Sequence, residues 1–161
     1  MDLELKKDLT SNWFKTLQDA FCNDIKKIEQ NKTKFVSTNW KRSVKKNEGG
    51  GEYRILQNGN VFEKVGINFS KVYGKFPKQF QKNIPGAQKD PRFWASGISV
   101  VMHMKNPLIP AMHFNTRYIC TTQDWFGGGM DLTPSKIDQT EKKNFHKILR
   151  NMCNRHDKNY Y

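Results

Sequence analysis

The sequence predicts an α+β fold, in which an antiparallel β-sheet is flanked by α-helices. Apolar residues recur at helical spacing near both ends of the chain. The segment between them is rich in β-branched and aromatic residues and is interrupted by turn signals. A chain of 161 residues is long enough for one core, so we expect a single domain over residues 1–161.

The first predicted element is an amphipathic helix over residues 8–30. Polar residues fill most of the gaps in an apolar stripe made of Trp13, Phe14, Leu17, Ala20, Phe21, Ile25 and Ile28. Residues 35–76 are expected to form an antiparallel meander of FVSTNW, YRIL and VFEKVGINF, with a hairpin turn at Asn58-Gly59. Residues 75–91, which are interrupted by prolines, are predicted to be a surface loop.

Two further strands, joined by a connector, are expected between residues 93 and 120. A second helix is expected over 139–154, because Asp138 and Glu141 have the spacing of a capping box. The stripe that follows is typical of a packed helix and consists of Phe145, Ile148, Leu149 and Met152.

The two strands around NPLIP are expected to gather polar side chains on one sheet face. Successive side chains of a strand alternate between faces, so Ser99 and His103 share one side of the first strand. His113, Asn115 and Arg117 share one side of the second strand. A hairpin centred near Leu108 would pair His103 with His113, Val101 with Asn115, and Ser99 with Arg117.

This polar face can serve several chemistries. Two facing imidazoles can bind a divalent metal, or one imidazole can transfer protons near neutral pH. Arg117 presents a planar fork suited to a carboxylate or phosphate, and Ser99 and Asn115 can orient what it binds. A solvent-facing sheet surface without function is the alternative at this point.

A second unusual segment is WFGGGMDLTP, residues 125–134. Its three glycines allow a ligand to approach the backbone closely, or allow the chain to adopt positive φ. Trp125 and Phe126 can wall a flat apolar ligand, and Asp131 supplies an anionic group beside it. No Gly-Lys-Ser/Thr follows, so the segment is not a P-loop. A flexible turn is the default for three glycines alone, here and at residues 49–51.

The charge balance favours an anionic ligand. Lys and Arg total 28 against 15 Asp and Glu, a net charge of +13, which would attract nucleic acid, anionic lipid or a polycarboxylate. A Lys- and Asn-rich composition that reflects an A+T-rich genome is the plainer explanation. No recognised nucleic-acid motif is present, so we expect no nucleic-acid partner.

Other features concern the cellular setting. No apolar run is long enough for a membrane span, and the first twenty residues lack the apolar core of a signal peptide, so we expect a cytoplasmic protein. The three cysteines lie far apart in no CxxC pair and are expected to be reduced.

Three segments together resemble oxygen-dependent coproporphyrinogen III oxidase. They are GGGEYRILQNGNVFEKVGINFSKVYG (49–74), FWASGISVVMHMKNPLIPAMHFNTRY (93–118) and WFGGGMDLTP (125–134). The resemblance implies haem biosynthesis through oxidative decarboxylation of two propionates of coproporphyrinogen III to vinyl groups, with dioxygen as co-substrate and no organic cofactor. It also implies a homodimer and a large, flat antiparallel sheet covered on both faces by helices.

The resemblance assigns roles to residues at matching positions. It implies that His113 is a proton donor and that Asp131 faces the site. The residues implied to contact substrate are Ser99, Asn115, Thr116 and Arg117. The implied divalent-metal ligands are His103, His113 and His146, and a zinc metallohydrolase using these three histidines is an alternative function.

The chain also departs from the family. Met104 and Ala111 replace a usual Pro and Thr on the connector. The family's sequence continues beyond the segments found here, so we expect a truncated form of its fold, and the 161-residue chain alone to be at best weakly active. A portion of a longer protein, a split-enzyme half and an inactive remnant that binds a polyanion without turnover are open alternatives.

Overall fold

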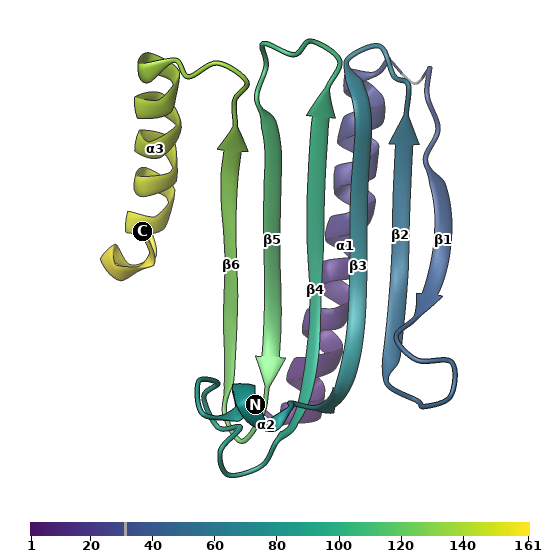
Figure 1. The fold of residues 1–161 in the computed structure, drawn as a ribbon, viewed down its shortest axis with the longest axis vertical. Coiled ribbons are helices and arrows are strands. Elements are labelled where there is room, and N and C mark those ends of the chain that lie inside the picture. Colours follow the sequence, from purple (N-terminus) through teal and green to yellow (C-terminus); the bar gives the residue numbers. More distant parts are fainter. Residues whose placement is uncertain (31) are drawn as a thin grey trace.

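The structure, a computed structural model, describes residues 1–30 and 32–161. Six antiparallel strands form one sheet in chain order (Figure 1). The strands are β1 (Val36–Lys41), β2 (Gly49–Gln57), β3 (Phe62–Lys75), β4 (Arg92–Met104), β5 (Ala111–Cys120) and β6 (Asp124–Thr133). The helices are α1 (Leu3–Ile28), α2 (Lys78–Gln81), α3 (Gln139–Asn154) and the 3-10 turn η1 (Lys158–Tyr160). The predicted α+β fold is confirmed.

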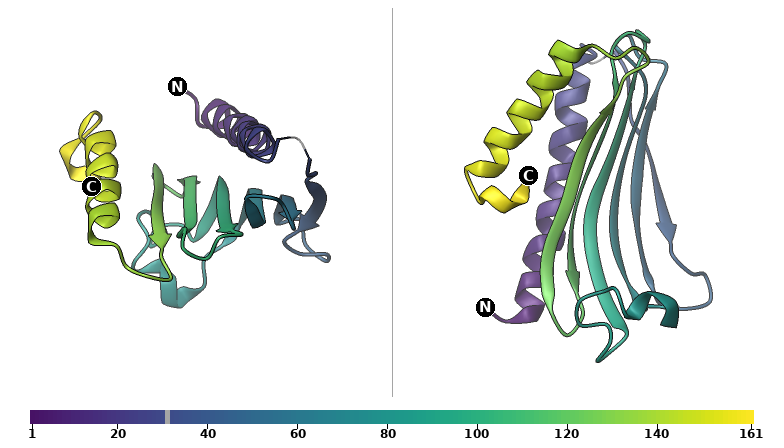
Figure 2. Two further views of the ribbon diagram at one scale, coloured as in Figure 1. Left: turned by 90° about the horizontal axis from the view of Figure 1, so that it is seen from above. Right: turned by 60° about the vertical axis from the view of Figure 1, so that its left-hand side comes forward.

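Helix α1 packs across β3 and β4 on one face of the sheet, which we call the helix face (Figure 2). The helix begins earlier than predicted because the Asp2 side chain accepts a hydrogen bond from the Leu5 N–H at 3.3 Å and caps the first turn. The core between helix and sheet contains Phe14, Cys22, Ile25, Leu56, Val65, Ile67, Ile98, Val100, Met102 and Tyr118. We call the opposite face of the sheet the open face.

The buried carboxylate of Glu29, which directly follows α1, binds the β2–β3 hairpin through hydrogen bonds. It accepts hydrogen bonds from the backbone N–H groups of Asn60, Val61 and Phe62 at 2.6, 2.9 and 2.7 Å. The hairpin signal at Asn58-Gly59 is confirmed, with Asn58 at φ 55°. The turn is therefore held by a side chain from a distant helix as well as by its own sequence.

Both glycine triplets lie inside strands rather than in turns. Gly49, Gly50 and Gly51 open β2 and pair with β1 or β3, and Gly127, Gly128 and Gly129 pair with β5. Glycine weakens a strand in isolation, but neighbouring strands supply the hydrogen bonds here. The turn interpretation of the triplets is therefore wrong. The predicted loop over residues 75–91 is confirmed, apart from the end of β3 and the short helix α2.

Helix α3 has the predicted bounds, but its apolar stripe is only partly packed. The Asp138 side chain accepts hydrogen bonds from the N–H groups of Thr140 and Glu141, which confirms the N-cap. No residue of α3 is buried, and Ile148 is 66% exposed. The helix lies beside the β6 edge rather than across a sheet face (Figure 2), so Phe145 and Leu149 of its stripe are half-buried while Ile148 and Met152 stay exposed.

Two further features concern the sequence-based expectations. Cys22, Cys120 and Cys153 are free thiols, and the first two are buried. Within residues 1–30 and 32–161, no helix combines the length and apolar character needed to cross a bilayer.

Candidate functional site

The β4–β5 hairpin places the predicted polar side chains on the open face, with a register two residues from the expected one. Val101 lies opposite His113, Ser99 opposite Asn115, and Gly97 opposite Arg117. A shift of two residues preserves the face of every side chain, so the predicted cluster is retained while the predicted pairs are wrong.

Asn106 explains this register. Its side-chain oxygen accepts a hydrogen bond from the Leu108 N–H at 3.0 Å, and its carbonyl accepts one from the Ile109 N–H at 3.1 Å. The observed hairpin is therefore centred on Pro107, one residue before Leu108, where the prediction had placed the centre.

Side chains that pair at one level of the sheet form a polar row across the open face. The polar row consists of Thr38, Tyr53, Asn68, Ser99 and Asn115, one from each of β1 to β5. The indole N–H of Trp40 donates to Oδ1 of Asn68 at 2.9 Å. Sequence reasoning missed Asn68 and Trp40. The sequence does show Asn68 as a polar residue between the apolar Ile67 and Phe69. The residues beside it on the neighbouring strands, however, are set by pairing between segments that are distant in the sequence.

The next level of the sheet forms a glycine row beside the polar row. It consists of Gly51, Ser70, Gly97 and Gly127, with Trp40 at one end and Arg117 between the last two glycines. A Cβ atom built on Gly127 would meet nothing within 4 Å. Four strand spacings separate Trp40 from Arg117, roughly 19 Å, so a flat ligand could lie close to the backbone along this floor.

Arg117 is available to an anion from outside the chain. Its side chain is exposed, and no ion pair to it is present among the described residues. The glycines on both sides of it contribute no side chain that would block approach. A guanidinium in this setting can bind a carboxylate with two parallel hydrogen bonds.

His113 and Asp131 form a pair across β5 and β6. Nδ1 of His113 lies 2.7 Å from Oδ1 of Asp131, and the Thr133 hydroxyl lies 3.5 Å from the same carboxylate oxygen. When Nδ1–H donates to Asp131, the imidazole orientation is fixed and Nε2 is left to accept or deliver a proton. The pair therefore has the geometry of a general acid–base with an orienting carboxylate.

The predicted metal ligands are only partly brought together. The His103 and His113 rings lie 6.3 Å apart between centroids. His146 lies on α3, where its Nδ1 atom is 2.8 Å from the Tyr161 hydroxyl oxygen. Across residues 1–30 and 32–161, no group of three His, Cys, Asp or Glu side chains is placed to hold a metal ion. As arranged, these residues do not fit a three-histidine site, and their metal role stays a prediction.

Two residues that were predicted to contact the ligand, Thr116 and Phe126, have their side chains on the helix face, because side chains alternate along a strand. Thr116 pairs with Ile98 and Gly128, so its side chain lies on the helix face while Arg117 lies on the open face. Trp125 pairs with Ile119 on the open face, whereas Phe126 packs on Tyr118 on the helix face, with ring centroids 4.7 Å apart. Trp125 alone can wall a ligand on the open face, and Thr116 can meet it only through its backbone.

Comparison with known proteins agrees with the motifs. Residues 9–161 match the family model described as coproporphyrinogen III oxidase. The chain belongs to the coproporphyrinogen III oxidase family. It is 48% identical over 163 residues to the oxygen-dependent coproporphyrinogen-III oxidases of Rickettsia akari (strain Hartford) and Rickettsia typhi (strain ATCC VR-144 / Wilmington). The protein of that name from Rickettsia rickettsii (strain Sheila Smith) is 47% identical over 169 residues.

The chain spans only part of these coproporphyrinogen III oxidases. The match to the Rickettsia akari protein covers 96% of this chain and 57% of the relative, and the match to the Rickettsia rickettsii protein covers 100% and 59%. Family membership confirms the resemblance seen in the motifs, whereas the roles of individual site residues stay predictions.

Proposed function

We propose that this chain provides the substrate-binding sheet of an oxygen-dependent coproporphyrinogen III oxidase, which acts in haem biosynthesis. The relatives at 48% identity bear that name. The observation that carries the proposal is the position of Arg117 on the open face, between Gly97 of β4 and Gly127 of β6. His113 and Asp131 lie on the same face, on β5 and β6.

Substrate binding follows from the shape and charge of this face. The tetrapyrrole lies over the glycine row, where the absence of side chains allows close contact with the backbone. One propionate pairs with Arg117, and the positive net charge of +13 attracts the other carboxylates. Ser99, Asn115 and Asn68 orient the ligand by hydrogen bonds from the neighbouring row.

The proposed reaction converts two propionate side chains to vinyl groups. In each conversion the bond to the carboxylate carbon breaks and carbon dioxide leaves, a hydrogen is lost as a proton from the carbon attached to the pyrrole, and the double bond of the vinyl group forms. The two electrons removed pass to dioxygen as co-substrate, which takes up that proton and one from solvent and becomes hydrogen peroxide. His113 moves a proton at Nε2, while Asp131 holds the ring through Nδ1. This scheme assigns no step to a metal or to an organic cofactor.

A second candidate is binding without turnover by one part of a larger or divided enzyme. The chain spans 57% of the Rickettsia akari relative. Within the described residues, β1 and β6 each pair on one side only, so both edges of the sheet are open. Weak activity of the chain alone, a homodimer and a cytoplasmic location stay predictions, and sedimentation velocity tests the dimer.

An anaerobic titration with coproporphyrinogen III separates these candidates. Binding is followed first without oxygen, and oxygen is then admitted while protoporphyrin fluorescence is recorded after oxidation of the product. Binding with turnover supports the enzyme within these 161 residues, and binding without turnover supports the second candidate. Absence of binding would contradict both.

A further inference from the structure

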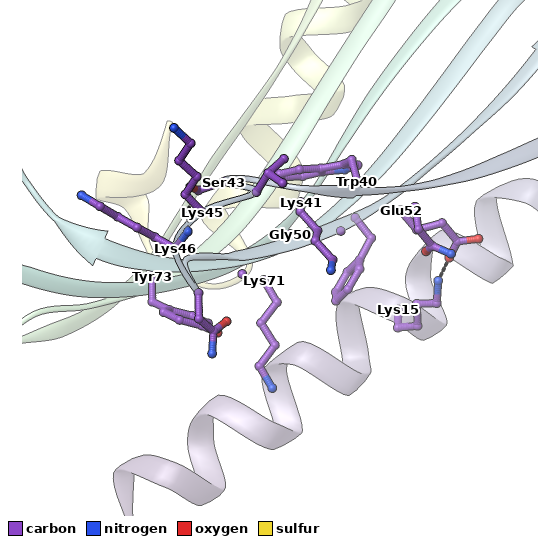
Figure 3. Close-up of a pocket in the computed structure, with 16 residues that line it drawn as sticks. Lys15, Trp40, Lys41, Ser43, Lys45, Lys46, Gly50, Glu52, Lys71 and Tyr73 are labelled. Carbon is purple, nitrogen blue, oxygen red and sulfur yellow. Dashed lines mark hydrogen bonds and ion pairs between the residues drawn. The ribbon is translucent and has the colours of Figure 1, made fainter.

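A cavity of about 810 Å³ lies between α1 and the β1–β2 end of the sheet (Figure 3). Helix α1 packs on β3 and β4, so the outer two strands extend beyond it and leave this space. Gly50 and Glu52 of β2 lie on the helix face, because they alternate with Gly51 and Tyr53 of the open face. The cavity therefore opens mainly on the helix face, and it shares only Trp40 and Gly51 of β1 and β2 with the β1 end of the glycine row.

The cavity is lined mainly by positive charge. Five lysines line it, namely Lys15, Lys41, Lys45, Lys46 and Lys71. Glu52 is the one carboxylate among the described residues of the lining, and it is already bound by Lys15 and by Nε of Arg54, the latter at 3.0 Å. The excess of lysine is therefore not neutralised inside the cavity.

The remaining charges near these lysines are few. Nζ of Lys71 lies 4.0 Å from Oδ1 of Asp8, whose side chain is largely exposed. No ion pair to Lys41, Lys45 or Lys46 occurs among residues 1–30 and 32–161. Burial and the nearby Arg54 lower the pKa of Lys15.

Apolar surface lies beside the lysines. Phe69 and Tyr73 of β3 contribute aromatic rings to the lining, and Nζ of Lys15 lies 5.5 Å from the Phe69 ring centroid. The Tyr73 hydroxyl donates to Asn47 and ties the β1–β2 loop to β3. Gly50, the glycine of β2 on the helix face, adds no side chain beside these rings.

We infer that this cavity is a second binding site, on the sheet face opposite the candidate active site, for an amphipathic polycarboxylate. Several separated ammonium groups suit several separated carboxylates, and the two rings suit an apolar body between them. The volume falls within the range of small-molecule sites. The described lining residues supply lysines as point charges, and the aromatic rings of Phe69 and Tyr73 beside them favour a carboxylate ligand that carries an apolar body over a purely inorganic anion. This inference does not rest on the proposed catalytic function.

The test is a fluorescence titration of the purified chain with coproporphyrin III, a stable oxidised tetracarboxylate. It uses an Arg117→Gln background to remove the guanidinium of the other face. Lys41→Gln combined with Lys71→Gln removes two charges from the cavity, and Lys143→Gln combined with Lys147→Gln removes two from α3 as a matched control. We expect the dissociation constant to rise about tenfold for the cavity pair and less than about twofold for the control pair. Circular dichroism and thermal unfolding check that all variants fold.

A third variant tests the cavity even if the double lysine variant fails to fold. Val44 is 94% exposed, so Val44→Glu adds a negative charge at the cavity without disturbing the core, and it should also weaken binding. Equal affinity in the cavity and control pairs would overturn the inference, as would absence of binding. Tighter binding of inorganic tripolyphosphate than of coproporphyrin III would overturn the assignment to polycarboxylates.

Discussion

The imidazole of His113 and the carboxylate of Asp131 meet across neighbouring strands, with Nδ1 and Oδ1 2.7 Å apart. The two residues are direct partners in the β5–β6 ladder, so the rigid sheet sets their separation. Both side chains are accessible, at 37% and 66% exposure. A positioned proton donor or acceptor is thus present on the same face as Arg117.

Replacement of His113 should impair chemistry without impairing folding. His113→Ala is expected to slow turnover by about 10² to 10⁴-fold, because a general acid or base contributes that much. Asp131→Asn should cost less, because the amide can still accept a hydrogen bond from Nδ1–H. Single-turnover formation of protoporphyrin measures both, with His156→Ala as a matched control.

A second readout for the pair does not need turnover. Imidazole ¹⁵N chemical shifts should show a changed tautomer balance of His113 in the Asp131→Asn variant, because the charged acceptor at Nδ1 is removed. Unchanged shifts in that variant, or unfolding of His113→Ala, would contradict the proposed roles.

The two faces of the glycine segment in β6 should respond differently to added side chains. Gly127 and Gly129 face open space, so valine at either position should leave the thermal midpoint nearly unchanged but weaken coproporphyrinogen binding. A Cβ at Gly128 would lie 2.5 Å from the Asn115 carbonyl oxygen, so Gly128→Ala should lower stability. Calorimetry and anaerobic binding titration measure these effects. Full affinity in Gly127→Val would show that the ligand does not lie on the glycine row.

Glu29 should make folding stability depend on pH. Burial acts to raise its pKa, but the hydrogen bonds from Phe62, Asn60 and Val61 outweigh burial and hold the pKa below its ordinary value of 4.5. A lowered pKa in the folded state gives stabilisation that is present above pH 4.5 and is lost as the pH falls through the lowered value.

Two variants of Glu29 test this anchor. Glu29→Ala should reduce the free energy of unfolding by roughly 3 kcal/mol at neutral pH, since it leaves buried N–H donors without partners. Glu29→Gln should lose less stability than the parent chain as the pH falls from about 5 to about 3, because the amide does not take up a proton in this range. Urea unfolding across this range measures both, and identical pH profiles for parent and Glu29→Gln would refute the assignment.

The hydrogen bond between the Tyr118 hydroxyl and the Asp124 carboxylate should affect the pKa of Asp124. The Tyr118 hydroxyl donates to Oδ2 of Asp124, and Lys6 binds the same oxygen from α1 at 2.9 Å. These two contacts, with Tyr118 first, hold the pKa of Asp124 below its ordinary value. Tyr118→Phe should therefore raise that pKa, and Lys6→Gln should raise it less. Carboxyl ¹³C shifts measure the change, and an Asp124 pKa unaffected by Tyr118→Phe would show that the bond is absent in solution.

The parts of the fold that local sequence determines were predictable. Asp138 marks the start of α3, and Asn58-Gly59 marks the β2–β3 turn, because a cap and a turn depend on a few adjacent residues. Face membership of His113 and Arg117 also followed from alternation along one strand.

Non-local contacts account for what the sequence did not predict. The glycines of β2 and β6 become strands because neighbouring strands pair with them. The hairpin register follows the Asn106 side chain. The juxtaposition of Asn68 with Ser99 needs the β3–β4 pairing, and the partly exposed stripe of α3 depends on where that helix lies relative to the sheet.

Anaerobic titration of coproporphyrinogen III against Arg117→Gln tests the central proposal most directly. Arg92→Gln is the matched control, because Arg92 is exposed and pairs with Asp90 at the start of β4. We predict that Arg117→Gln weakens binding by about tenfold or more, since it removes a charge-assisted pair, while Arg92→Gln stays close to the parent. Equal affinity of the Arg117→Gln variant and the parent chain would contradict the assignment of the open face as the substrate site.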